Sequence, residues 1–97
     1  NNDNIQVEIK GRTCNSTQYQ DTIVSLSKIH EAETLMDDNP DLKVYLFFVF
    51  TDKTMYIQIP KERDWKVRFT GTWGIKHYLI PVNELIEFEG VEILSNR

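Results

Sequence analysis

Apolar and polar residues alternate between Ile5 and Lys10, which predicts a short β-strand near the start of the chain. The period of two places Glu8 and Lys10 side by side on the polar face. Gly11 then allows the chain to turn away from the strand. Such a pattern is typical of a half-buried strand whose polar face is solvated.

A helix and a long apolar strand follow a small polar loop over residues 13–18. Apolar residues at near-helical spacing predict a helix that begins at Ser25 or Ser27 and stops at residues 37–40, where Pro40 disfavours helical backbone. Residues 43–50 are apolar on both faces, which predicts a central strand of a sheet covered on both sides. Whether residues 19–24 join the helix or approach it as extended chain stays open.

Shorter elements complete the predicted fold: a turn over 51–54, an antiparallel strand over 55–59, a charged loop over 60–64, a strand over 65–69, a strand over 75–80, a helical turn over 81–84 and an edge strand over 91–94. In the strand over 65–69, Trp65, Val67 and Phe69 are expected to point inward, with Lys66 and Arg68 outward. The predicted fold class is α/β (α+β), with a single mixed β-sheet and one main helix. The first strand is expected to run parallel to the central one.

Composition indicates one ordinary domain over residues 1–97, with 40% hydrophobic and 27% charged residues. No apolar run approaches the roughly 20 residues of a membrane span, so no membrane contact is expected. The single cysteine, Cys14, excludes an internal disulfide and fits a reducing, cytoplasmic location.

The net charge of −4 argues against a protein that coats nucleic acid generally. A basic region between residues 61 and 77 nevertheless contains interleaved tryptophan and phenylalanine, which would suit local contact with phosphates. Several chemistries are disfavoured. The glycines form no phosphate-binding loop, and one cysteine with two histidines does not make a structural zinc site.

The order of segments resembles the PD-(D/E)XK nuclease superfamily, whose core is restriction-endonuclease-like, and above all its small bacteriophage members. The resemblance rests on these segments: residues 7–12, Tyr19, residues 23–28, residues 44–50, residues 55–59 and residues 77–82. Its specific motif is Glu8-x-Lys10 on a strand.

The resemblance implies a Mg²⁺ (or Mn²⁺) cofactor, with the Glu8 carboxylate and the backbone carbonyl of Ile9 as metal ligands. It implies that Lys10 orients or deprotonates the attacking water and steadies charge on the phosphate. Arg12 and Lys28 match positions that are basic in similar phage sequences, and Lys66 and Arg68 are further candidates for contact with DNA.

The chain departs from the superfamily at the first metal-binding carboxylate, which normally lies on a strand well upstream of Glu-x-Lys. Only seven residues precede Glu8, and Asp3 is too close in sequence to lie across a hairpin from it. Three explanations stay open: N-terminal truncation of the fold, Asp3 as an unusual substitute, or a degenerate and non-catalytic copy. A missing hairpin would leave the edge of the first strand free for a homodimer.

The function expected from the resemblance is a metal-dependent DNA phosphodiester hydrolase, endonuclease-like, or a fragment of one, acting inside a bacterial host or encoded by its phage. The alternative is a non-catalytic accessory module that binds protein or nucleic acid. In the alternative without chemistry, Glu8 and Lys10 form a surface ion pair worth under about 1 kcal/mol.

Overall fold

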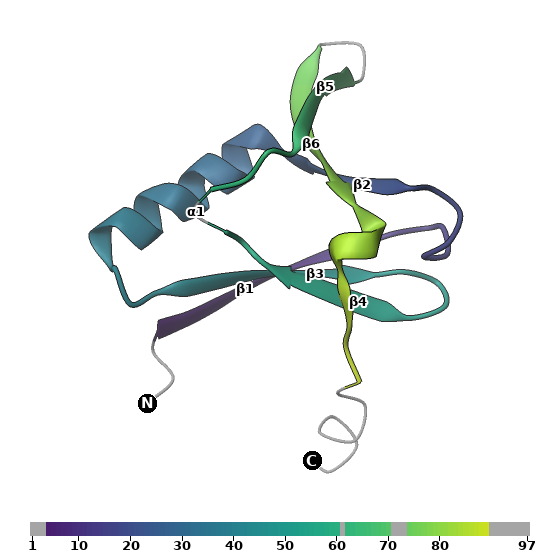
Figure 1. Cartoon of the computed structure of the whole chain (residues 1–97), viewed down its shortest axis with the longest axis horizontal. Helices are drawn as coiled ribbons and strands as arrows, with labels where there is room; N and C mark the ends of the chain where they lie inside the picture. Colours follow the sequence, from purple (N-terminus) through teal and green to yellow (C-terminus); the bar gives the residue numbers. More distant parts are fainter. Residues whose placement is uncertain (1–3, 61, 71–73, 90–97) are drawn as a thin grey trace.

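One helix and two β-sheets make up the fold in this computed structural model, which describes residues 4–60, 62–70 and 74–89 (Figure 1). In chain order, the elements are β1 (Ile5–Gly11), β2 (Asp21–Ser25), α1 (Leu26–Asp38), β3 (Lys43–Val49), β4 (Thr54–Gln58), β5 (Lys66–Thr70), β6 (Ile75–Pro81), the 3-10 turn η2 (Val82–Glu84) and β7 (Ile86–Glu87). No helix of the described residues is long and apolar enough to span a membrane.

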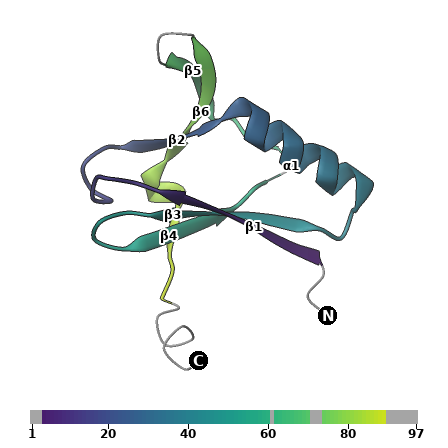
Figure 2. The same ribbon diagram turned by 180° about the vertical axis from the view of Figure 1, so that it is seen from behind.

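The larger sheet has the strand order β1-β3-β4-β7. The strand β1 runs parallel to β3, and β4 pairs antiparallel with β3 after the turn, so both predictions for these strands are confirmed. The connection between the parallel strands passes through α1, which lies across the same side of the sheet as the smaller sheet (Figures 1 and 2).

A second sheet, with the antiparallel order β2-β6-β5, corrects the prediction of a single mixed sheet. Residues 19–24, which the sequence left undecided, include most of β2. This strand leads directly into α1 and pairs with β6, more than 50 residues later in the chain. The class, a mixture of α and β with one main helix, is as predicted.

The helix α1 has the predicted boundaries because its capping residues act as expected. The Ser25 side chain accepts a hydrogen bond from the Lys28 N–H at 3.4 Å, which satisfies one free donor of the first turn. At the other end, the Asn39 N–H donates to the Leu35 carbonyl, and Pro40 follows. The face with Ile29, Ala32 and Met36 is buried.

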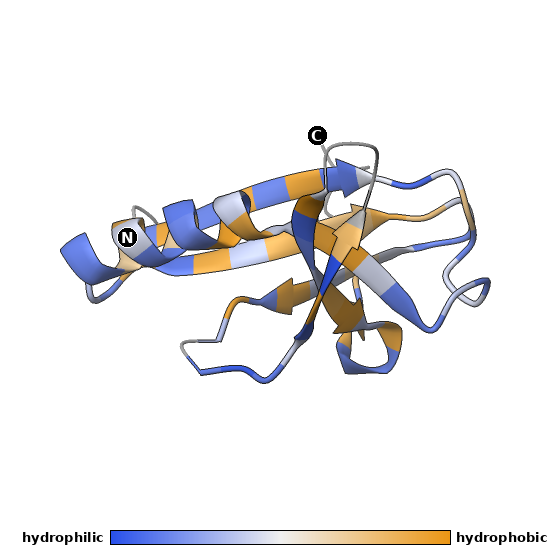
Figure 3. Ribbon diagram, turned by 90° about the horizontal axis from the view of Figure 1, so that it is seen from above, coloured by the Kyte–Doolittle hydropathy of each residue, from blue (hydrophilic) through white to orange (hydrophobic). Residues whose placement is uncertain are grey.

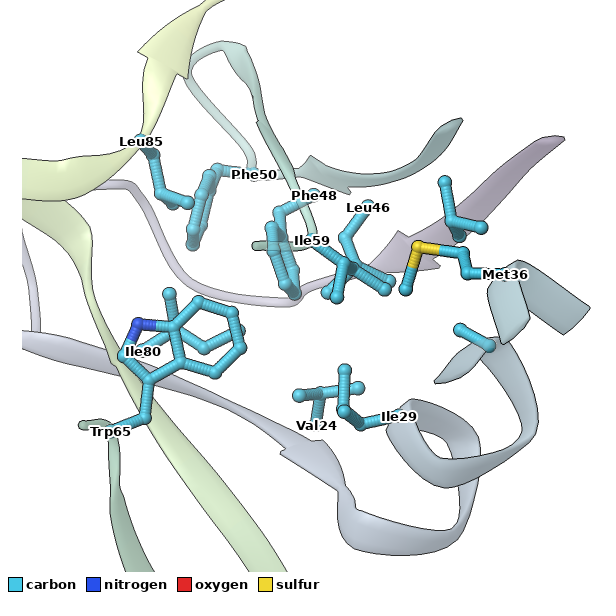
Figure 4. Packing of buried hydrophobic residues seen from close by; sticks show 12 residues of the cluster. Val24, Ile29, Met36, Leu46, Phe48, Phe50, Ile59, Trp65, Ile80 and Leu85 are labelled. Atoms are coloured by element: carbon cyan, nitrogen blue, oxygen red, sulfur yellow. The ribbon is translucent and has the colours of Figure 1, made fainter. Parts of the chain in front are cut away.

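The core lies between α1, the inner face of the larger sheet and the smaller sheet. Figure 4 shows Phe48 and Leu46 of β3 meeting Ile29 of α1 and Ile80 of β6 in this space. Trp65 closes one side, and its indole N–H donates to Glu84 at 3.2 Å. Figure 3 shows the same distribution: apolar colours gather where the strands of the two sheets cross, whereas the loops and the far end of α1 are mostly hydrophilic.

The strand β1 faces the opposite way from the expectation of a solvated polar face. Glu8 is paired with Leu46 and Lys10 with Phe48, and residues paired in a parallel ladder lie on the same face of the sheet. Leu46 and Phe48 are buried core residues, so Glu8 and Lys10 also lie on the inner face. The apolar residues of β1 lie on the outer face instead: Ile5, Val7 and Ile9 are 51%, 47% and 69% exposed.

The outer face of the larger sheet is apolar and only half covered, which corrects the prediction that β3 is covered on both sides. Phe47 stacks on Tyr56 of β4 with 5.2 Å between ring centroids, and Phe88 meets Phe47 edge-on at 5.0 Å. No described helix lies over these rings, and Val49 next to them is exposed. The outer face therefore gains aromatic packing without being sealed from solvent.

The strand β5 is also less buried than predicted. Trp65, just before it, is buried as expected, but Val67 and Phe69 are 48% and 63% exposed. The reason is that β5 is an edge strand that pairs with β6 alone and projects beyond the core (Figure 1). Lys66 and Arg68 are exposed, as predicted, but exposure on both faces of β5 means that the strand has no inward face of the kind expected.

The remaining predictions are confirmed where they can be compared. The turn over 51–54, the strand over 75–80 and the helical turn near 81–84 all occur in the described residues, and Pro60 and residues 62–64 lie outside any helix or strand, as predicted. The edge strand expected over 91–94 lies outside the described residues.

Because Leu46 faces the core and Ile9 faces solvent, truncating these two side chains should lower the free energy of unfolding by different amounts. Leu46→Ala should lower the free energy of unfolding by about 2–5 kcal/mol because it opens a cavity in the core. Ile9→Ala should lower it by less than about 1 kcal/mol because that side chain is already mostly in solvent. Denaturant unfolding of both variants measures the difference, and equal losses would contradict the orientation of β1.

Candidate metal and nucleic-acid site

The Glu8 carboxylate is the most unusual polar group on the inner face of β1. Its residue is half-buried, and its Oε1 atom is fully buried with no hydrogen-bond partner among the described residues. A buried acceptor without a partner is costly, because it has lost its hydrogen bonds to water without replacement. A cation or a bound water would remove that cost.

Lys10 lies on the same face, two residues further along β1, and is also half-buried. It forms no ion pair with Glu8 or with any other described residue, where the ion pairs are Lys53–Glu87 and Arg63–Glu33. The surface ion pair considered as the alternative without chemistry is therefore not the arrangement found. The ammonium group remains available for an anion next to Glu8.

The backbone carbonyl of Ile9 points to the free edge of β1. The Arg12 N–H donates to the Val49 carbonyl of β3 at 2.9 Å, which continues the ladder between the two strands. Main-chain groups of successive residues in a strand point to opposite edges, so Lys10 and Glu8 also direct theirs to β3. Ile9 directs its carbonyl away from β3, where the sheet has no further described strand.

Two oxygen donors, the Glu8 carboxylate and the Ile9 carbonyl, fit a hard divalent cation such as Mg²⁺ or Mn²⁺. The described residues contain no group of three or more histidine, cysteine, aspartate or glutamate side chains that could hold a metal. Asp3, the other carboxylate considered from the sequence, lies outside the described residues. These two donors alone would make only part of a metal site, which water or substrate phosphate would have to extend.

Arg12 reaches from the end of β1 to the second sheet. Its Nε donates to the Thr22 hydroxyl at 3.1 Å and one Nη to the Ile23 carbonyl at 2.5 Å, while the guanidinium lies 5.2 Å from the centroid of the Phe48 ring. Burial lowers the pKa of Arg12 from its ordinary value, and nearby Cys14 opposes that shift. The residue joins the two sheets and is half-buried, unlike a freely exposed DNA-binding arginine.

Lys28, Lys66 and Arg68, the other candidate DNA contacts, are exposed. Lys28 lies in the first turn of α1, whereas Lys66 and Arg68 share one face of β5. The structure brings Arg68 to the same pocket as Arg12, and neither of the two lysines lines that pocket. The predicted basic residues thus separate into one arginine pair and two isolated cations.

The pocket shared by Arg12 and Arg68 has a volume of about 620 Å³, and sequence reasoning did not predict it. Its wall is largely the polar loop between β1 and β2, including Cys14 and Tyr19. The loop is anchored by Asp52, which accepts hydrogen bonds from the Ser16 N–H and hydroxyl, both at 2.7 Å. These hydrogen bonds hold the pKa of Asp52 below its usual value. The only signal in the sequence was the run of small polar residues after the Glu-x-Lys strand.

Arg63, which the sequence placed in the basic region, has a structural role. It forms an ion pair with Glu33 of α1 at 2.6 Å, donates to the Pro60 carbonyl at 3.0 Å, and lies 5.1 Å from the centroid of the Tyr78 ring. Burial would lower the pKa of Arg63, but the hydrogen bonds and charges of Glu33 and Tyr78 raise it overall. The basic region is therefore not one continuous surface for phosphates.

A comparison with protein-family models matches residues 3–73 to the family described as "Phage putative PDDEXK endonuclease". The match covers most of the chain, from before β1 through β5, and includes Glu8-x-Lys10. The chain therefore belongs to this family, which confirms the resemblance to phage-type PD-(D/E)XK proteins. Comparisons with curated proteins and with solved structures found no match.

Proposed function

We propose that this chain is a metal-dependent DNA phosphodiester hydrolase of the endonuclease type, or the core of one. The observation that carries the proposal is a carboxylate oxygen of Glu8 that is buried without a partner among the described residues. Lys10, which forms no ion pair with those residues, lies next to it on the same strand face. Membership of a phage PDDEXK endonuclease family supports the same chemistry. Residues 1–97 are proposed to act as a single nuclease-like domain in the cytoplasm of a bacterial host.

In the proposed reaction, the Glu8 carboxylate and the Ile9 carbonyl are the residues that would hold Mg²⁺ or Mn²⁺. When bound, the cation supplies Lewis acidity toward the phosphate and lowers the pKa of a bound water. Lys10 positions the attacking water or accepts its proton, and its positive charge stabilises the charge that develops on the phosphate. A further carboxylate from outside the described residues would strengthen this metal site.

Basic residues near this site would contact the phosphate groups of the DNA substrate. Arg12 lies two residues beyond Lys10, just after the end of β1, and Arg68 of β5 lines the same pocket as Arg12. Lys28 and Lys66 are exposed cations that could contact more distant phosphates. We propose that these four residues position the substrate and contribute little to base recognition.

Substitution of the two motif residues should abolish cleavage without unfolding the protein. Glu8→Gln and Lys10→Met should each reduce DNA cleavage in Mg²⁺ or Mn²⁺ by at least about 100-fold, because each removes a group that acts on the reacting phosphate or water. Glu31→Gln, a matched change of an exposed carboxylate on α1, should leave cleavage unchanged. Cleavage that survives both motif substitutions would refute this mechanism.

A non-catalytic binding module is the second candidate, because β1 has exposed apolar side chains and one edge that pairs with no other described strand. Such an edge can pair with the same strand of a second copy, which gives a homodimer. A module of this kind should bind DNA or protein equally well in chelator and in Mg²⁺, whereas the nuclease should depend on the metal.

The dimer can be tested by a substitution at the free edge. The Val7 N–H points away from β3, like that of Ile9, so Val7→Pro removes an edge donor while sparing the ladder with β3. Sedimentation should show a concentration-dependent dimer for the natural chain and a monomer for the variant. A natural chain that sediments as a monomer at every concentration would exclude this assembly.

A further inference from the structure

A pocket lies at the C-terminal end of β1, and its lining includes Arg12 but neither Glu8 nor Lys10. Its lining combines the loop between β1 and β2 with residues of β2, β5 and β6. A volume of about 620 Å³ falls within the range of small-molecule binding sites, roughly 300–1,000 Å³.

The charge of this pocket is positive, although the chain as a whole carries −4. Among the described residues that line it, Arg12 and Arg68 are the cations and the exposed Asp21 is the one carboxylate. Asp52 does not line the pocket, and its carboxylate already accepts hydrogen bonds from Ser16. The balance of fixed charges therefore favours an anion.

Arg12 is half-buried, yet it has no charged partner in the part of the chain that the structure describes. Its hydrogen-bond acceptors are all neutral oxygens, those of Gly11, Thr22 and Ile23. Arg63, by contrast, has the Glu33 carboxylate at 2.6 Å. Three of the five guanidinium N–H groups of Arg12 are used in these bonds, which leaves donors for a ligand. A charge taken partly out of water without a counter-charge is stabilised when an anion binds beside it.

Arg68 and Tyr19 supply the other features of a nucleotide site. Arg68 is exposed and has no hydrogen bond or ion pair with the described residues, so its guanidinium is available to the pocket. Tyr19 lines the same pocket and is 61% exposed, so its ring offers a surface on which a base can stack.

We propose that this pocket binds the terminal phosphate of a nucleotide, held between Arg12 and Arg68 with the base near Tyr19. A phosphate monoester carries nearly two negative charges, which matches two guanidinium groups better than the single charge of an internal diester. The ligand is either the phosphorylated end of a DNA strand or a free mononucleotide. The first source rests on the proposed nuclease function, since the end would then lie about 13 Å along β1 from Glu8.

Binding measured in chelator tests this pocket without any need for cleavage. The probes are short single-stranded oligonucleotides with a 5′-phosphate, a 3′-phosphate or hydroxyls at both ends, together with thymidine 5′-monophosphate as a free nucleotide. At least one phosphorylated oligonucleotide should bind about tenfold or more tightly than the hydroxyl form, since a charge-assisted pair of hydrogen bonds is lost without the phosphate. Thymidine monophosphate that competes as strongly as the oligonucleotide would identify free nucleotides as the source.

Arg68→Ala should remove this preference, because it deletes one of the two guanidinium groups proposed to hold the phosphate. The variant should fold, because Arg68 is exposed and makes no hydrogen bond or ion pair with the described residues. Lys43→Ala removes an equal charge at the other end of the larger sheet and should keep the preference. Arg12 is not used as the test, because its substitution would also break the contact between the sheets.

Two outcomes would overturn the proposal: no preference for any phosphorylated ligand, or an equal loss of affinity in Arg68→Ala and Lys43→Ala. Glu8→Gln should retain the phosphate preference. A protein that shows this preference and cleaves no DNA in Mg²⁺ would refute the nuclease proposal and leave the pocket assignment intact.

Discussion

The parallel ladder between β1 and β3 is the constraint on which the rest of the structure depends. Because Leu46 and Phe48 of β3 must face the core, the register carries Glu8 and Lys10 to the same face. A shift of one residue would exchange them with Val7 and Ile9 and bury an apolar strand face instead. The strand β1 therefore has an exposed apolar face and a partly buried polar face. This arrangement costs free energy unless the polar side chains bind a partner such as a cation or an anion.

Arg12, just after β1, links the larger sheet to the smaller one. It follows β1 on the inner face, packs over Phe48 and donates to both a side chain and a carbonyl of β2. The same side chain therefore helps to hold the sheets together and brings an uncompensated positive charge to the pocket. Arg12 thus has both a structural role and a proposed role in binding, whereas Arg68 adds charge to the pocket without a hydrogen bond or ion pair to the described residues.

Local signals predicted much of the fold. The helix α1 follows from Ser25 and Pro40, and β3 with its antiparallel partner follows from a long apolar run and a turn. Which face of β1 meets the core could not be predicted, because alternation identifies two faces but does not distinguish the buried one from the exposed one. The second sheet was missed because the pairing of β2 with β6 joins segments far apart in the sequence.

The candidate site divides in the same way. Glu8, Ile9 and Lys10 were predicted from a three-residue motif, and their proposed roles still await measurement. Two further features depend on tertiary packing and could not be predicted from local patterns in one sequence. They are the Glu8 carboxylate oxygen without a described partner and the position of Arg12 and Arg68 in the lining of one pocket. Arg63 shows the converse, since a cation that belonged to the basic region by sequence is paired with Glu33 in the fold.

Calorimetric titration with Mn²⁺ tests most directly whether the inward-facing Glu8 forms a metal site. The natural chain and Glu31→Gln should bind Mn²⁺ with the same affinity, and Glu8→Gln should lose that binding, because only Glu8 offers a buried carboxylate oxygen without a partner among the described residues. Equal binding by the natural chain and Glu8→Gln, or no binding by either, would contradict the account.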